Sequence, residues 1–351
     1  MHCGVGQPRK SGNPIKHPSL SFDDGNLALL CGDTYFLVHQ GLLCRHSEVL
    51  DSLTCKLHND EHLGLIEGRP VLNLDDSSQD IAYLIEALYD GLRDSLCYDH
   101  SDMPAVSGLL RLSTKYQMRH LRHQLLRSLS TMWPTTLVQW ENRESSAVNS
   151  SGVYTPRPKM PHPLTIINLA REVDALELLP SAYYDLSRYL PSQTTLGSTF
   201  AEGYSPELLP HDDLVNTLRG REYAARFFST FIVNHLEGRK SSQLCSYRNE
   251  QKPNKRRRCQ MAFEQVTFEI LRGVSGFTCN RNSDPLLALW DTIAMQTRED
   301  VPGQENRTGL RACDMCRFEY NVLVGSARAE FWSKLPEWFG VTVANWDQPF
   351  A

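Results

Sequence analysis

Four cysteines in the last third of the chain have the residue type and spacing of a metal site. Cys313 and Cys316 form a CxxC pair, and two thiolates at this spacing reach one tetrahedral ion across a tight turn. Cys245 and Cys259 lie upstream and supply two further sulfurs. The sequence therefore predicts a structural Zn²⁺ site whose ligands are Cys245, Cys259, Cys313 and Cys316.

Free thiols and a redox-active pair are the alternatives to this zinc site. Thirteen residues separate Cys245 from Cys259 and fifty-three separate Cys259 from Cys313, so the spacing is irregular. A redox CxxC normally follows a strand of a thioredoxin-like unit, and no such pattern precedes Cys313. Cys279 is the substitute ligand if one of the four lies too far away.

Two other groups of residues could do chemistry but have simpler explanations. His58, Asp60, Glu61 and His62 are metal-ligating types, yet no spacing anchors them to a rigid element, so a solvated loop is expected. Lys255 to Arg258 are four consecutive cations. Such a run is most often a solvated loop, and otherwise a nuclear localisation signal or a phosphate patch.

Helices must bring the cysteines together. Apolar periodicity predicts helices over 261–274 and 284–295, between the upstream cysteines and the CxxC pair. Earlier helices are expected over 164–180 and 181–191, closed by Pro180 and Pro191. Another helical segment, 211–238, contains Gly220, where a kink or a break into two helices is expected.

The N-terminal part has a different pattern. Leu27 to Cys31 and Tyr35 to His39 are apolar runs separated by Gly32 and Asp33, which predicts a tight β-hairpin. From Leu42 to Leu53 the apolar residues recur at helical spacing, and Ser47 falls on the polar side. A strand pair is therefore expected to lead directly into an amphipathic helix.

This stretch resembles the signature of the BTB/POZ domain. The matching residues are Phe36, Val38, His39, Leu42, Leu43, Ser47, Val49 and Leu50. Downstream, 69–76 resembles the third strand of that domain, 77–91 its next helix, and 107–129 its last two helices, broken near Tyr116. The remainder resembles fungal proteins that join such a domain to a helical, cysteine-containing region ending in Arg328, Trp332, Leu335, Pro336, Phe339 and Gly340.

The resemblance implies a scaffold for protein–protein interaction without catalytic residues. Its expected partners are proteins, among them a second copy of the chain or a cullin-type ubiquitin ligase. Cullin-recruiting relatives often carry a hydrophobic-x-Glu element, and the corresponding loop, 97–106, contains no Glu. The proline-rich arm also offers no helix for a domain-exchanged dimer. No enzyme is expected, since the chain has no GxGxxG, GxxxxGK[ST], HExxH or GxSxG motif.

Composition and charge indicate which partners and which cellular location to expect. The net charge of −5 gives no overall affinity for nucleic acid or anionic membranes. The N-terminal residues lack the apolar core of a signal peptide, and no run is long enough to span a membrane. An intracellular location, cytoplasmic or nuclear, is therefore expected, with the ten cysteines as thiols or metal ligands rather than disulfides.

The expected fold class is α+β, a BTB/POZ domain followed by a mostly α-helical region. The expected segments are 1–19 as a disordered arm, 20–135 as the BTB/POZ domain, 136–163 as a linker, 164–240 as a helical region, and 241–351 as a helical cysteine-containing region. The function expected first is an interaction scaffold. The alternative is a nuclear transcriptional regulator that uses the basic, cysteine-rich C-terminal region.

Overall fold

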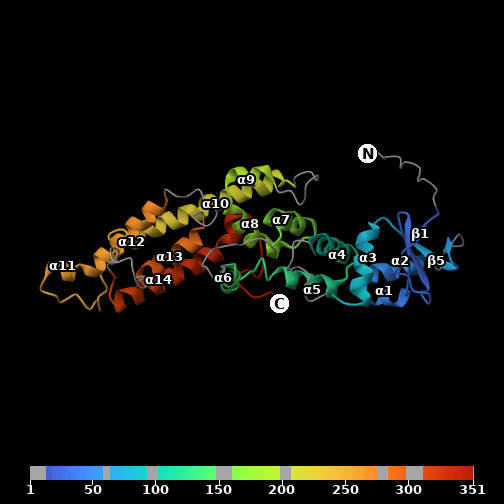
Figure 1. Cartoon of the computed structure of the whole chain (residues 1–351), viewed down its shortest axis with the longest axis horizontal. Coiled ribbons are helices and arrows are strands. Elements are labelled where there is room, and N and C mark those ends of the chain that lie inside the picture. The colour runs from blue at the N-terminus through green and yellow to red at the C-terminus, as the bar shows by residue number, and fades with distance from the viewer. Residues whose placement is uncertain are drawn as a thin grey trace, which may run out of the picture. The chain divides into compact units, whose positions relative to one another are not determined.

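The structure is a computed structural model that describes residues 13–57, 64–92, 102–147, 160–197, 207–274, 284–297 and 311–350. It confirms an α+β fold, in which a five-stranded mixed sheet with helices is followed by a mostly helical region. The chain divides into two compact units (Figure 1). The first comprises 1–129 with 157–161, and the second comprises 130–156 with 162–351.

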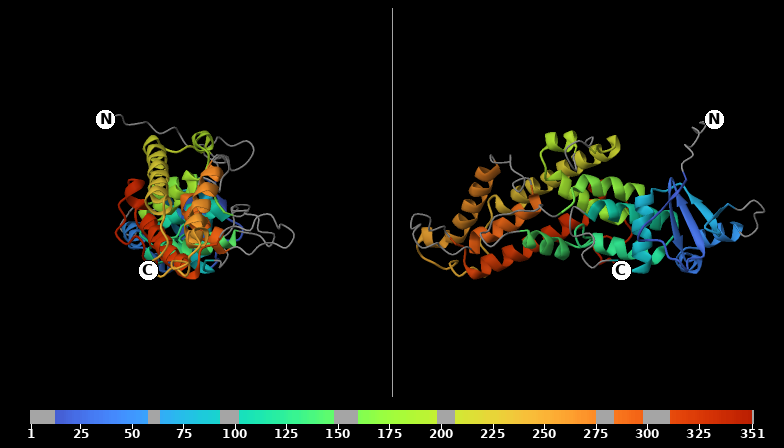
Figure 2. Two further views of the ribbon diagram at one scale, coloured as in Figure 1. Left: turned by 90° about the vertical axis from the view of Figure 1, so that its left-hand side faces the viewer. Right: turned by 45° about the vertical axis from the view of Figure 1, so that its right-hand side comes forward.

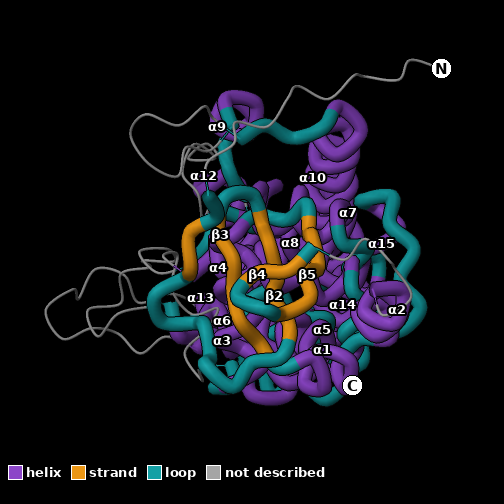
Figure 3. The backbone as a smooth tube through the Cα atoms, turned by 90° about the vertical axis from the view of Figure 1, so that its right-hand side faces the viewer, coloured by secondary structure: helices purple, strands orange, loops and turns teal. Residues whose placement is uncertain are grey.

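The sheet of the first unit has the strand order β1-β3-β2-β5-β4 (Figure 3). Its strands are β1 (Ile15–Lys16), β2 (Leu27–Cys31), β3 (Thr34–Val38), β4 (Leu65–Ile66) and β5 (Arg69–Leu74). The predicted hairpin is confirmed, because β2 and β3 pair antiparallel with Leu29 opposite Phe36, and Gly32 adopts a φ of 60° in the turn. β5 pairs with β2 in parallel.

The expected single helix after the hairpin is two helices, α1 (Gln40–His46) and α2 (Glu48–Leu57). The expectation that Ser47 faces water is wrong. Ser47 is buried between the two helices, where its Oγ donates to the carbonyl of Tyr116 at 2.6 Å and accepts from the amide of Leu50 at 3.0 Å. The hydroxyl therefore caps α2 and ties it to the end of a later helix.

Three further helices complete the described part of the first unit: α3 (Ser78–Tyr89), α4 (Met103–Lys115) and α5 (Arg119–Leu129). The break expected near Tyr116 is confirmed. Ser77 caps α3 by accepting from the amide of Gln79 at 3.2 Å. The leucines of α4 and α5 are buried, and most of the basic residues of the two helices are exposed, as the periodicity predicts.

The second unit is helical in its described residues. Its helices are α6 (Leu137–Ser146), α7 (Pro163–Glu172), the 3-10 helix η2 (Leu176–Leu178), α8 (Leu179–Ser187), α9 (Pro191–Leu196), α10 (His211–Phe231), the π-helical segment η3 (Ile232–Leu236), α11 (Pro253–Arg256), α12 (Arg258–Val274), α13 (Pro285–Thr297), α14 (Asp314–Ser333) and α15 (Leu335–Trp338). α6 lies in the segment expected to be a linker, and its Trp140 and Arg143 are buried. The part of that segment from 148 to 159 lies outside the described residues.

Two prolines begin helices that they were expected to end. Pro180 occupies the first turn of α8 and Pro191 the first turn of α9. Proline suits this position because its fixed φ is helical and the amide it lacks would have no partner there. The predicted segment 164–180 is consequently interrupted before Pro180, at η2.

Gly220 does not kink or divide its helix, so that expectation is also wrong. α10 runs without interruption from His211 to Phe231. A Cβ at position 220 would lie 2.0 Å from Cε1 of Phe339, so the glycine allows this ring to pack directly on the helix backbone. Three aromatic residues near the C-terminus, Phe331, Trp332 and Phe339, are fully buried.

The helices of the described part of the chain are all too short or too polar to cross a membrane.

Candidate metal centre

The four predicted cysteines come from three places in the second unit. Cys245 lies in the turn-rich segment after η3, and Cys259 is in the first turn of α12. Cys313 is the N-cap of α14, and Cys316 is in its first turn. α12 and α14 therefore present the same end to the site (Figure 1, Figure 2). Two helix N-termini, each with a partial positive charge, thus face the sulfurs and favour thiolates.

The sulfurs converge to the separation that a tetrahedral ion requires. Sγ of Cys245 lies 3.6 Å from Sγ of Cys259 and 3.8 Å from Sγ of Cys313, and all four sulfurs are within 4.8 Å of one another. Zinc–sulfur bonds of about 2.3 Å in a tetrahedron place the sulfurs about 3.8 Å apart. The four cysteines are each at most 9% exposed, so the group is closed to solvent.

Backbone amides point at the sulfurs. The amide of Ser242 donates to Cys316 Sγ at 3.3 Å, and that of Cys313 donates to Cys259 Sγ at 3.2 Å. Burial alone raises the pKa of the Cys313 thiol, but the amides of Cys316 and Ser246 donate to it and lower its pKa to about 6. Burial raises the pKa of Cys259 to about 12. Cys313 is therefore the cysteine that most readily becomes a thiolate, whereas a metal ion must displace the proton of Cys259 in order to bind it.

An apolar core surrounds the cysteines. Phe231, Leu236, Phe263, Val266 and Tyr320 belong to the same buried cluster as the four sulfurs. The guanidinium of Arg239 lies 5.1 Å from the ring centroid of Phe263 and 5.0 Å from that of Tyr320. Its charge acts on Cys316, and burial lowers the pKa of Arg239. The guanidinium therefore offsets part of the negative charge that a four-thiolate zinc centre carries.

This donor set fits a structural metal ion. Four buried sulfurs leave no ligand position for water or substrate, which distinguishes a structural site from a catalytic one. The described cysteines form no disulfide. The CxxC pair at a helix N-terminus with one lowered pKa also has features of a redox pair, but such a pair needs only two sulfurs. Two additional buried sulfurs in contact with Cys313 therefore favour a metal.

Several residues of interest lie elsewhere or were not anticipated. Cys279, the substitute ligand, and the group His58, Asp60, Glu61 and His62 lie outside the described residues. No sequence pattern indicated Arg239 or the amides of Ser242 and Ser246, because backbone donors and stacked cations have no characteristic spacing. Cys31 is buried in the sheet far from this group in sequence, and burial raises its pKa to about 12, so it is an inert core thiol.

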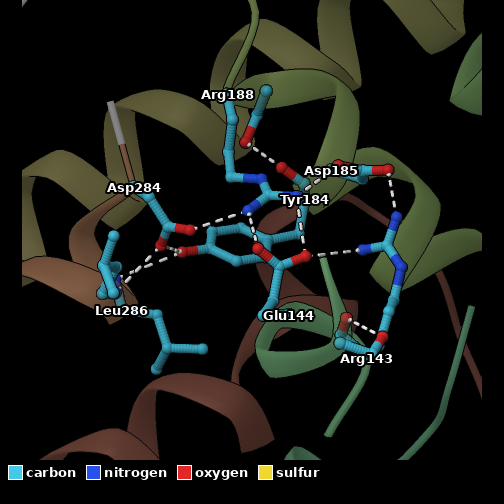
Figure 4. Close-up of polar contacts among 10 residues, drawn as sticks. Arg143, Glu144, Tyr184, Asp185, Arg188, Asp284 and Leu286 are labelled. Atoms are coloured by element: carbon cyan, nitrogen blue, oxygen red, sulfur yellow. Dashed lines mark hydrogen bonds and ion pairs between the residues drawn. The ribbon is translucent and has the colours of Figure 1, made fainter. Parts of the chain in front are cut away.

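A second buried cluster consists of charged side chains (Figure 4). Arg188 contacts Asp284 at 2.8 Å and Glu144 at 2.7 Å, and Arg143 contacts Asp185 at 2.7 Å. Tyr184 donates to Asp284, and both arginines lie over the Trp140 ring. Each carboxylate forms an ion pair with a guanidinium group, so none of them is left as a ligand for a metal ion. The network is part of the core and connects α6, α8 and the start of α13.

No family model matches the chain, and comparison with curated proteins finds no match either.

Proposed function

We propose that this chain is a non-enzymatic scaffold for protein–protein interaction. Its N-terminal unit is a BTB/POZ domain that binds partner proteins, and its C-terminal region is braced by a structural zinc ion. Support for the domain comes from element order. The hairpin β2–β3, the helix pair α1–α2, strand β5, helix α3 and the pair α4–α5 follow one another at the residues that carry the resemblance.

The interaction function is supported by the edges of the sheet, which expose apolar side chains. The two edge strands, β1 and β4, are each two residues long and each presents an exposed apolar side chain, Ile15 at 69% and Leu65 at 63%. Lys16 on β1 lies 3.4 Å from Glu67, next to β4, so the curled sheet brings the two edges toward each other. Exposed apolar residues on strand edges are a surface suited to another polypeptide.

A second copy of the chain is the first partner to test. Light scattering of the full chain at micromolar concentration is expected to give a dimeric mass, and the double variant Ile15→Asp, Leu65→Asp a monomeric mass. Val138→Asp is the matched control, since Val138 is 65% exposed but lies in α6 of the other unit. A monomeric mass for the unmodified chain rules out the homodimer.

Other protein partners require a capture experiment. The full chain with a photo-reactive group in place of Lys16, next to Ile15 on β1, is expected to cross-link to specific proteins. The edge variant with the same group at position 16 is expected to capture none of them. Equal capture by the edge variant and the unmodified chain contradicts an interaction at this surface. Recovery of a cullin among those proteins tests the ubiquitin-ligase role.

The zinc ion is tested independently by metal analysis. Protein purified without chelator is expected to contain about one zinc per chain, and Cys316→Ser is expected to lose it. Cys55→Ser is the control, because Cys55 is exposed and belongs to the first unit. A chain without metal, in which Cys313 and Cys316 of the CxxC pair are joined by a disulfide, supports the redox alternative instead.

A further inference from the structure

The segment between Cys245 and Cys259 concentrates positive charge in an otherwise acidic chain. It contains six Lys or Arg residues and one Glu, a net charge of +5 within a chain of −5. The cations are Arg248, Lys252, Lys255, Arg256, Arg257 and Arg258. The rest of the chain therefore carries −10, and the overall charge conceals a local region of positive potential.

The cations of this segment are available to a partner. Residues 251–258 are all exposed. Arg257 lies 3.7 Å from Glu264, Arg258 stacks over Tyr247, and Arg248 bonds to Gln243. Within the described part of the chain, the side chains of Lys252, Lys255 and Arg256 make no hydrogen bond or ion pair. None of these cations contacts a cysteine sulfur, so they do not serve to neutralise the candidate metal centre.

The two cysteines hold the ends of this loop together. Their sulfurs lie 3.6 Å apart although the residues are fourteen positions apart, so the loop is closed at its base. The loop contains α11, which leads directly into α12 (Figure 1). Closing a loop removes conformational freedom before binding, so less conformational entropy is lost when a partner binds.

The conformation of the loop favours a grooved anionic partner over a flat one. Lys255 and Arg256 are in α11, and Arg258 begins α12, so consecutive cations diverge by about 100° around a helical turn. A flat anionic membrane reaches only one side of such an arrangement. The major groove of B-form DNA is about 12 Å wide with phosphates on both walls, and a helical segment of about 10–12 Å fits it.

We propose that this closed basic loop binds the phosphate backbone of double-stranded DNA without reading its sequence. The helical winding of Lys255 to Arg258 also argues against recognition as an extended peptide by a transport receptor. The inference is independent of whether the first unit is an interaction domain. It needs only that the cysteines hold the loop closed.

The test is fluorescence anisotropy of the full chain with labelled duplexes of unrelated sequence, each about two helical turns long, at several salt concentrations. Binding is expected with little sequence preference, and a contact of about four phosphates gives a slope of log K against log salt of about −3.6. Lys255→Glu with Arg256→Glu is expected to weaken binding roughly tenfold or more and to reduce the slope by about two. Lys255→Arg is expected to bind as the unmodified chain does.

The control moves the same charge change to the other unit. Lys56→Glu with Arg119→Glu alters two exposed cations of α2 and α5 and is expected to change affinity less than about twofold. Circular dichroism and zinc content establish that each variant is folded and metal-loaded. The proposal is overturned if the full chain does not bind duplex DNA at about 50 mM salt, if the loop variant binds as well as the control, or if only anionic vesicles or single-stranded RNA are bound.

Discussion

Arg188 Nη1 lies 2.8 Å from Asp284 Oδ2, although the two residues are 96 positions apart in the sequence. Both side chains are at most 5% exposed. The pair joins the end of α8 to the residue that precedes α13, and Asp284 also accepts from Tyr184 and from the amide of Leu287 at 3.0 Å. Asp284 thus caps α13 while it balances a buried guanidinium.

Removing this carboxylate should destabilise the second unit strongly. Asp284→Ala leaves the charge of Arg188 with one fewer partner and is expected to cost about 3–5 kcal/mol in free energy of unfolding. Chemical denaturation measures the loss. Lys334→Ala, which breaks the exposed pair with Glu330, is the control and should cost about 0–1 kcal/mol. Equal effects of the two substitutions would contradict the structural role of the network.

Glu144 should make stability depend on pH. Burial opposes its ionisation, but the neighbouring Arg188 and Arg143 outweigh burial and lower its pKa below the ordinary value of 4.5. A carboxyl whose folded pKa is depressed contributes stability above its unfolded pKa and loses it as pH falls through the folded pKa. Glu144→Gln should therefore cost about 1–3 kcal/mol near pH 7 and progressively less below pH 4.5.

Denaturation curves at neutral pH and at successively lower pH test this dependence. Glu222→Gln, at an exposed position of α10, should leave the curves nearly superimposable on those of the unmodified chain. A cost of Glu144→Gln that stays constant over the same pH range would show that its charge is not what stabilises the network.

Replacement of two helical glycines by alanine should change stability in opposite directions. Gly220→Ala places a Cβ 2.0 Å from the Phe339 ring and is expected to destabilise by about 1–3 kcal/mol through overpacking. Gly325, inside α14, has open space where a Cβ would lie. Gly325→Ala should therefore stabilise by about 0.4–1 kcal/mol. Thermal unfolding distinguishes the two, and a stabilising Gly220→Ala would mean that Phe339 does not pack on α10.

Metal removal should loosen the end of the second unit where the cysteines meet. A strong chelator is expected to lower the unfolding temperature and to expose the segment between Cys245 and Cys259 to proteolysis, because structural zinc supplies on the order of 10 kcal/mol. Re-addition of zinc under reducing conditions should restore protection. If chelation leaves the proteolytic pattern unchanged, the cysteines do not hold a structural ion.

Local signals in the sequence were sufficient for elements with strong periodicity. The hairpin at Gly32 and the helices α12 and α13 follow from apolar spacing and turn residues within a few positions. The break at Tyr116 was expected from the resemblance to the BTB/POZ domain. The CxxC pair was likewise recognisable because thiolate chemistry is specific. Its upstream ligands could be proposed only because cysteine has few other uses in a chain of this kind.

Features decided by distant partners could not be obtained in this way. Gly220 has the same local sequence whether it kinks a helix or admits Phe339, and the difference lies 119 positions away. Ser47 looks solvent-facing until Tyr116 supplies its acceptor. Pro180 and Pro191 are compatible with either end of a helix. The charged network could not be predicted, because Arg188 and Asp284 belong to separate segments that become neighbours only in the folded chain.

The four cysteines of the candidate metal centre are synthesised in two pairs that are well separated in time. Cys245 and Cys259 leave the ribosome first, and Cys313 follows 54 positions after Cys259. At about 5–20 residues per second this interval lasts roughly 3–11 s, during which two sulfurs that lie 3.6 Å apart in the folded protein have no companions. Oxidation in that interval would join the two sulfurs to each other and leave only two of the four thiolates for a tetrahedral ion. Loading of the proposed metal site would therefore compete with thiol oxidation until the second pair of cysteines is synthesised.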